Sequence, residues 1–232
     1  MAFVSDRCCV LTPTIDVFGL TIAESTTTIT DYLITAVAWW LGARLVRGAV
    51  GRRQYSHWLW GLGFLFVGLG ALLGGTSHGF VAYLSDATLS AIWKGTAYAV
   101  GLSMLFAVAG TIEGSFLRKT TRRTFHLINA LGFVLYAIWM VNHSAFIYIV
   151  YHYVSAMISV ALIQVWAFVH HRAATAPWII AGVIITLVGA VIQQSGFSLH
   201  THFNNNDLYH VVQIVGLALL YRGASQLEST VL

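Results

Sequence analysis

Seven stretches of about 20 mostly apolar residues make up most of this sequence, and each is long enough to cross the hydrocarbon core of a bilayer. The stretches are continuously apolar rather than alternating, which favours helices over the strands of a barrel. We therefore predict an all-α integral membrane bundle of seven transmembrane helices, which is a multi-pass membrane protein. The expected spans are 28–47, 57–78, 90–112, 123–142, 145–169, 177–199 and 207–225.

The composition agrees with this class of protein. The chain is 58% hydrophobic and 9% charged, whereas soluble domains are about 25% charged. A net charge of +4 is spread over short connectors, which suits membrane topology better than nucleic-acid binding, so we expect no nucleic-acid partner. We predict one transmembrane domain, 28–225, between an extracytoplasmic segment, 1–27, and a short cytoplasmic tail, 226–232.

Basic residues alternate between the connectors and predict an orientation. They gather after the first, third, fifth and seventh runs, whereas the other connectors contain acidic Asp86 and Asp207 without lysine or arginine. The positive-inside rule then places the N-terminus outside and the C-terminus in the cytoplasm. The basic residues that determine this assignment are Arg44, Arg47, Arg52, Arg53, Arg118, Lys119, Arg122, Arg123, Arg172 and Arg222.

In this orientation, polar side chains collect near the outer ends of the predicted helices. Ionisable groups at membrane depth are costly and usually face the bundle interior or a water-filled cavity. The second run ends with Ser77 and His78, and the seventh begins with Asp207 and His210. The same side also holds Lys94, His143, Tyr148, His152, His200, His202 and Asn206.

The outer histidines suggest a metal site. Neutral imidazole is a common metal ligand, and catalytic zinc commonly binds three protein ligands and one water. We expect Zn²⁺ to be held by His78, His210 and either His200 or His202. Asp86 or Asp207 would orient a ligand or act as a general base on the bound water. The alternative is that these histidines simply occupy the interface, where one edge of the ring stays hydrated.

Three acidic residues near the start of the first run, and Lys94 in the third run, are further charged groups on the predicted outer side. Asp16, Glu24 and Asp31 precede or open the first run and could bind calcium through their oxygens, but we expect a solvated polar lead-in. Lys94 is expected to extend towards the interface or to pair with Asp86 or Asp207.

The arrangement resembles the alkaline ceramidase and adiponectin-receptor superfamily. The shared features are seven helices, an outside N-terminus, His78 ending the second helix, Asp86 soon after it, and the motif NDLYH, which ends at His210 and opens the seventh helix. Members of that superfamily are seven-helix membrane hydrolases with a three-histidine zinc site, a serine and an aspartate. The resemblance covers the second, third and seventh helices and the overall plan, and implies His78 and His210 as ligands and Asp86 as the acid.

The sequence departs from that pattern at two positions. The first histidine of the seventh-helix pair would fall at Asn206, so the resemblance needs His200 or His202 as the third ligand. The family's serine, one turn before the second-helix histidine, would fall at Gly74, and the nearby hydroxyls of Thr76 and Ser77 lie on other faces of the helix.

The leading prediction is a zinc-dependent intramembrane hydrolase of a lipid amide or ester, such as a ceramide-like membrane lipid. Asp86 or Asp207 would handle the proton, and Ser77, Lys94 or Tyr148 would stabilise the oxyanion. One alternative is a b-type haem or other redox membrane protein, with haem ligated by His78 and either His143 or His210. The other alternative is a non-enzymatic receptor, transporter or membrane-complex subunit.

Overall fold

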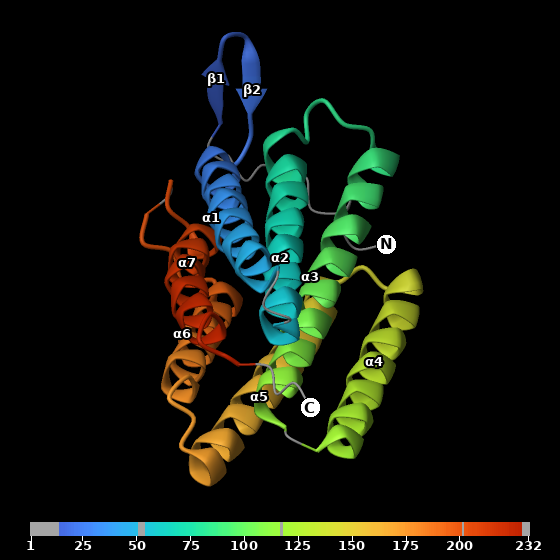
Figure 1. Cartoon of the computed structure of the whole chain (residues 1–232). Helices are drawn as coiled ribbons and strands as arrows, with labels where there is room; N and C mark the ends of the chain where they lie inside the picture. Colours follow the sequence, from blue (N-terminus) through green and yellow to red (C-terminus); the bar gives the residue numbers. More distant parts are fainter. Residues whose placement is uncertain (1–13, 51–53, 117, 201, 229–232) are drawn as a thin grey trace.

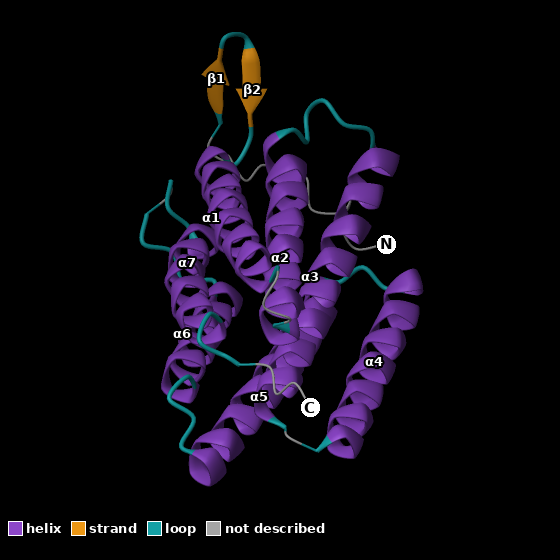
Figure 2. Ribbon diagram, viewed as in Figure 1, coloured by secondary structure: helices purple, strands orange, loops and turns teal. Residues whose placement is uncertain are grey.

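The computed structural model describes residues 14–50, 54–116, 118–200 and 202–228. Seven helices form the body of this part of the chain, and a short β-hairpin precedes them (Figures 1 and 2). The all-α prediction is therefore confirmed for the helical body. The elements are β1 (Ile15–Val17), β2 (Leu20–Ile22), α1 (Ser25–Ala49), α2 (Tyr55–Gly79), α3 (Asp86–Ser115), α4 (Lys119–Asn142), α5 (Phe146–His171), α6 (Ala176–Ser195) and α7 (Asn205–Ala224).

Some of the predicted features fall outside the described residues. These are Arg52 and Arg53, residues 1–13 of the segment 1–27, and residues 229–232 of the tail 226–232.

Five helices, α2 to α6, are long and apolar enough to cross a membrane. Helices α1 and α7 contain 25 and 20 residues, which at 1.5 Å per residue gives lengths of about 37 and 30 Å. They are long enough to span but more polar, because α1 opens with a threonine-rich turn and α7 opens with Asn205, Asn206 and Asp207.

Helix α1 lies close against α2 because small residues face each other. A Cβ added to Gly42 would lie 2.9 Å from the carbonyl oxygen of Gly61, and one added to Gly75 would lie 2.8 Å from Cβ of Asp31. A side chain at Gly42 or Gly75 would therefore force the two helices apart. Gly75 is near the end of α2, so this close approach brings Asp31 against the last turns of α2.

The last helix returns to the first. Helix α7 packs against both α6 and α1, as the red and blue ribbons in Figure 1 show. The main apolar core runs through the bundle, and its buried members come from every helix except α4. The beginning of α1, the end of α2 and the beginning of α7 consequently meet at one end of the bundle.

Helix α4 lies at the periphery, packed chiefly on α3 (Figure 1). Its only buried residues are Tyr136 and Met140. Polar contacts fasten its first turns to α3, where Glu113 accepts from Arg122 at 3.0 Å and lies 2.7 Å from Nε2 of His126. The remaining surface of α4 is largely apolar and exposed, through Leu127, Ile128, Leu131, Val134, Leu135, Ile138 and Trp139.

The hairpin leads directly into α1. Strands β1 and β2 pair antiparallel, with Val17 opposite Leu20, and the turn between them places Phe18 and Gly19 at positive φ. The backbone N–H of Thr21 donates to the Tyr83 hydroxyl at 2.8 Å, which holds the hairpin to the α2–α3 connection. Glu24, also at positive φ, then turns the chain into the first residue of α1.

Candidate functional site

Five ionisable side chains meet where α1 begins, α2 ends and α7 begins. We call them the carboxylate–imidazole cluster, which consists of Glu24, Asp31, His78, Asp207 and His210. A backbone hydrogen bond of 3.1 Å from Ala23 N–H to the Gly79 carbonyl joins the start of α1 to the end of α2. Since α7 also packs on α1, all five side chains come from three adjoining helix ends.

His78 pairs with Glu24 at the outer edge of the cluster. The distance from His78 Nδ1 to Glu24 Oε2 is 3.0 Å, and both side chains are 28% exposed. Burial alone would raise the pKa of the Glu24 carboxyl, but the hydrogen bond and positive charge of His78 outweigh it and lower the pKa below its usual value. Glu24 is therefore a carboxylate at neutral pH, and it fixes the orientation of the His78 ring.

His210 is held by two groups of α1. Its Nδ1 lies 2.8 Å from Thr30 Oγ1, and its Nε2 lies 3.4 Å from Asp31 Oδ1. Both His210 and Asp31 are 6% exposed. Because Asp31 lies in the second turn of α1 and His210 in the second turn of α7, the contact is set by the packing of the first helix on the last.

The Thr30 hydroxyl indicates how the His210 ring is protonated. Thr30 Oγ1 also lies 2.9 Å from the Thr26 carbonyl, and threonine hydroxyls inside helices commonly donate to that i−4 position. Thr30 has one proton to give, so with that bond formed its oxygen accepts from Nδ1–H of His210. The Nε2 lone pair then faces the Asp31 carboxylate, and this pair of acceptors needs a proton or a cation between them.

Asp207 is the most buried member, at 1% exposure. Its Oδ1 accepts from Thr27 Oγ1 at 2.8 Å, and its Oδ2 accepts from the backbone N–H of Asn204 at 2.8 Å. Asn204 accepts in return from the Asp207 N–H, which completes a capping box at the start of α7. Asp207 thus joins the cluster as predicted, but both of its oxygens already serve to hold α7 and α1 together.

The cluster contains more acid than base. Three carboxylates face two imidazoles, and His78 interacts electrostatically with Asp31 and Asp207 as well as with Glu24. Among the described residues, no lysine or arginine is an electrostatic partner of Asp31. A buried excess of carboxylate is costly unless protons or a bound cation neutralise it. The cluster can therefore hold protons, or bind a cation, or exchange one for the other.

The side chains only partly match a metal site. Two ligand atoms at 2.0–2.1 Å from a tetrahedral zinc stand roughly 3.3 Å apart, and His210 Nε2 and Asp31 Oδ1 are 3.4 Å apart. No three His, Cys, Asp or Glu side chains in the described part of the chain are close enough together to hold a metal ion as they stand. Asp31 and His210 thus match one edge of a zinc site, and a third ligand requires a side-chain movement.

His200 and His202, the predicted third ligands, lie apart from the cluster in the α6–α7 connection. Both side chains are exposed. Their rings stack on each other with centroids 5.5 Å apart, and the backbone N–H of His202 donates to His200 Nδ1 at 3.1 Å. Asn206, in the same region, accepts through Oδ1 from Gln193 Nε2 at 3.3 Å.

Asp86 and Ser77 are also separate from the five clustered side chains. Asp86 is exposed in the first turn of α3. Ser77, one residue before His78, donates to the Gly74 carbonyl of its own helix at 2.8 Å. The structure therefore supplies neither as a direct partner of His210.

Four more predicted residues, Lys94 on α3, His143 directly after α4, and Tyr148 and His152 on α5, lie in a separate group with aromatic side chains of α4. Lys94 donates to the Met140 and Val141 carbonyls and, at 2.7 Å, to the His143 carbonyl, so it caps the C-terminal end of α4. The His143 ring stacks on Trp139 at 3.9 Å, Tyr148 meets it edge-on at 5.3 Å, and His152 stacks on Tyr136 at 4.1 Å.

The site contains two acids that the sequence interpretation left aside. The expectation of a solvated lead-in is wrong for Asp31, which is buried, and Glu24 is half-buried in its pair with His78. The available signal was the run ESTTTITD, residues 24–31, in which Thr27 and Asp31 are four residues apart and share a helix face.

Comparison with known proteins gives a family but no activity. No curated protein and no solved structure matches the chain. A family model described as a family of unknown function, DUF6962, matches residues 26–229. That match begins in the first turn of α1 and includes every residue of the cluster except Glu24. The chain belongs to this family of unknown function, DUF6962.

Proposed function

We propose that this chain is a seven-span integral membrane protein with its N-terminus outside and its C-terminus in the cytoplasm. The apolar exposed surface of α4 and the five apolar helices support a membrane location. The end of α1, which has Arg47 in its last turn, and the start of α4, which Lys119 opens, lie at the opposite end of the bundle from the cluster. In this orientation α1 and α7 complete the bundle, and their polar first turns lie at the outer membrane face.

The cluster is the reaction centre of a metal-dependent hydrolase that acts on a lipid amide or ester. The observation that carries this proposal is the contact of His210 Nε2 with the Asp31 carboxylate at 3.4 Å, beside His78. His78, His210 and Asp31 would hold one Zn²⁺, so Asp31 replaces the third histidine. When bound, zinc polarises a carbonyl group and makes water a stronger nucleophile near neutral pH.

The chain's own residues orient these ligands. Ligating histidines commonly donate their second ring N–H to a carboxylate or another acceptor, which fixes the tautomer. Glu24 at Nδ1 of His78 and Thr30 at Nδ1 of His210 occupy these positions, so neither partner uses the Nε2 atom of its histidine. Glu24, at 28% exposure, is also the carboxylate able to accept a proton and release it to water.

The neighbouring polar residues fit supporting roles. Thr27 and Asn204 satisfy Asp207, so the start of α7 stays in place while the site reacts. A membrane lipid would reach the centre from the outer leaflet, where the three helix ends meet. The proposed mechanism gives no direct part to four of the residues predicted from the sequence, Asp86, Ser77, Lys94 and Tyr148.

Turnover of a lipid reporter tests the activity. Fluorogenic long-chain amide and ester lipids in detergent micelles or vesicles are the substrates. We expect the wild-type protein to cleave one of them, and His78→Ala to reduce the rate to background. His143→Ala is the matched control, because His143 is on the same side of the bundle but packs on Trp139. Equal rates for all three proteins would reject the assignment.

A second function has its own support, because the cluster is already paired internally. Glu24 pairs with His78, Asp31 with His210, and Asp207 with Thr27 and the Asn204 backbone. Such a site can bind protons without metal, as in a proton-coupled transporter or a receptor. Protein that takes up protons between pH 8 and 5 while containing no metal would favour this function over hydrolysis.

The haem alternative receives little support from the arrangement of the histidines. His143 directly follows α4 and stacks on Trp139, whereas His78 lies on α2 in contact with Glu24. His210 is enclosed between Thr30 and Asp31. An absorption spectrum of purified protein distinguishes haem from the other assignments.

A further inference from the structure

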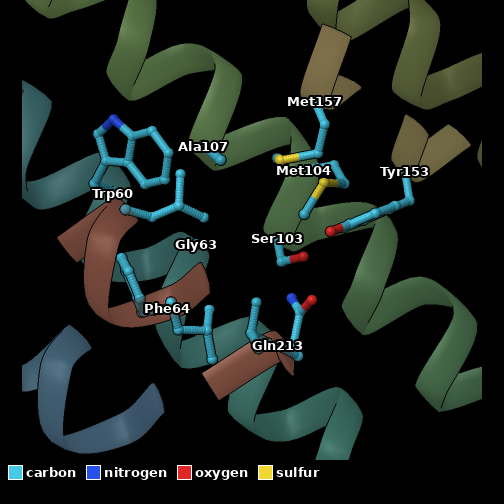
Figure 3. A pocket seen from close by; sticks show the side chains of 12 residues that line it. Trp60, Gly63, Phe64, Ser103, Met104, Ala107, Tyr153, Met157 and Gln213 are labelled. Atoms are coloured by element: carbon cyan, nitrogen blue, oxygen red, sulfur yellow. The ribbon is translucent and has the colours of Figure 1, made fainter. Parts of the chain in front are cut away.

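A pocket lies inside the bundle, between α2, α3, α5 and α7 (Figure 3). Most of its wall is apolar, but Ser103, Tyr153 and Gln213 place their polar ends towards the same space in Figure 3. Gln213 is three residues after His210 on α7, about 4.5 Å further along the axis. The remaining lining residues are Trp60, Gly63, Phe64, Val67, Met104, Ala107, Met157, Leu217 and Leu220.

Two of the three polar groups lack a partner. Tyr153 and Gln213 are 8% and 7% exposed, so each is more than nine-tenths buried. The Tyr153 hydroxyl lies near the Thr186 and Gln213 side chains, but neither this hydroxyl nor Oε1 of Gln213 reaches a partner within hydrogen-bond distance in the described part of the chain. The third group, Ser103, donates to the Val100 carbonyl at 2.7 Å and keeps its oxygen lone pairs.

Leaving these groups unsatisfied would be costly. A buried donor or acceptor without a partner costs about 1–3 kcal/mol, and two occur at one place in the bundle. Buried polar groups in proteins are satisfied almost without exception, by protein or by ordered water. The Tyr153 hydroxyl lies close to Gln213, so a single small molecule can reach both.

The size of the pocket determines the class of ligand. The centre of a water-sized sphere can occupy about 20 Å³ of it. A water molecule needs at least about 10–15 Å³ by the same measure, and it needs two to four polar partners. The pocket therefore has room for one water and three groups to bind it, whereas a drug-sized molecule needs a pocket of several hundred cubic ångströms.

We propose that one structural water binds between Ser103, Tyr153 and Gln213. The water donates to Gln213 Oε1, accepts from the Tyr153 hydroxyl and donates its second proton to Ser103 Oγ. It joins α3, α5 and α7 at a depth where the surrounding side chains are apolar. The carboxylate–imidazole cluster consequently has a bound water one helical turn from His210, on the side facing the membrane interior.

Radiolytic labelling tests the site independently of metal content and activity. Short X-ray pulses generate hydroxyl radicals from bound water, and nearby methionine is readily oxidised to the sulfoxide. Met157 lines the pocket and is 1% exposed, whereas Met140 is 0% exposed and lies in the separate α3–α4–α5 cluster. These two methionines are equally inaccessible from bulk solvent, so Met140 is a matched internal control.

The labelling is performed in ¹⁸O-water and read by mass spectrometry of peptides. We expect Met157 of the wild-type protein to be oxidised at least about tenfold faster than Met140, and Gln213→Leu to abolish that difference. Wild-type Met157 that is as unreactive as Met140 would overturn the proposal. Fast oxidation of Met157 that persists in Gln213→Leu would also overturn it, because the radical source would then be elsewhere.

Discussion

Asp31 on the first helix and His210 on the last helix are buried against each other, with Oδ1 and Nε2 3.4 Å apart. The two residues are 179 positions apart in the sequence, so the contact exists only because α7 closes the bundle against α1. The contact joins the two helices that are not among the five apolar enough to cross a membrane, and the proposed chemistry depends on it.

Replacing Asp31 with asparagine keeps the size of the side chain and removes its charge. If Asp31 is a ligand, zinc affinity should fall by more than about 100-fold, since even outer-shell partners of metal ligands are worth 10–100-fold. Competition with a chelating dye measures that affinity. Asp16→Asn, in the exposed hairpin, is the control and should leave it unchanged. An unaltered affinity in Asp31→Asn would remove Asp31 from the ligand set.

Thr30→Val removes the hydroxyl that holds Nδ1 of His210 and keeps the branched shape. We expect zinc affinity to fall by about 10–100-fold, because the imidazole loses the partner that fixes its tautomer and orientation. Thr124→Val is the matched control, since Thr124 makes the same i−4 backbone bond on exposed α4. Equal affinities in the two variants would show that Thr30 has only a helix-packing role.

Asn204→Ala should destabilise the start of α7. The substitution removes the side-chain acceptor of the capping box and costs about 1 kcal/mol, the usual cost of losing an N-cap residue. Thermal unfolding in detergent measures the change. Asn205→Ala, one residue later, removes a bond to the Gln193 carbonyl but no cap, and gives the comparison. A larger loss in Asn205→Ala than in Asn204→Ala would argue against the capping role.

Glu24→Gln should reveal a pH-dependent contribution to stability. The pKa of Glu24 is lower in the folded protein than its ordinary value of 4.5, so its contribution is fully present above about pH 4.5. The contribution is lost as the pH falls through the folded-state pKa, because the native carboxylate then takes up a proton. The difference in unfolding temperature between wild type and Glu24→Gln should therefore shrink between pH 5 and 3. A difference that stays constant over this range would show that the carboxylate charge contributes nothing.

Lys94→Met should loosen the C-terminal end of α4. Three carbonyl groups lose a charged donor, and hydrogen bonds to charged groups are worth about 1.5–3 kcal/mol. We expect faster proteolysis near Asn142 and a lower unfolding temperature. Lys119→Met, at the exposed N-terminal end of α4, is the control and should change neither the rate of proteolysis nor the unfolding temperature.

The helices could be predicted from the sequence because long apolar runs leave few alternatives in a bilayer. The expected span 123–142 corresponds to α4, Lys119–Asn142, and the span 207–225 corresponds to α7, Asn205–Ala224. The missing four residues at the start of α4 are polar and basic, so hydropathy could not include them. The hairpin was also missed, because two strands of three residues give too short an alternating pattern.

The site could be predicted only where a residue lies at a helix end on the side that the sequence predicts to face outwards. His78, Asp207 and His210 met this criterion and do come together. Asp31 was missed because its burial depends on α7 packing against α1, and the order of helices in a bundle does not follow from hydropathy. His200 and His202 are near His210 in sequence, but the α6–α7 connection carries them to the exposed surface.

Zinc content of detergent-purified protein, measured by elemental mass spectrometry, tests the central claim most directly. We predict about one zinc per chain in the wild type and in His200→Ala, whose side chain is exposed, and almost none in His210→Ala. Wild-type protein without metal, or zinc that is lost in His200→Ala and retained in His210→Ala, would contradict a metal centre at Asp31, His78 and His210.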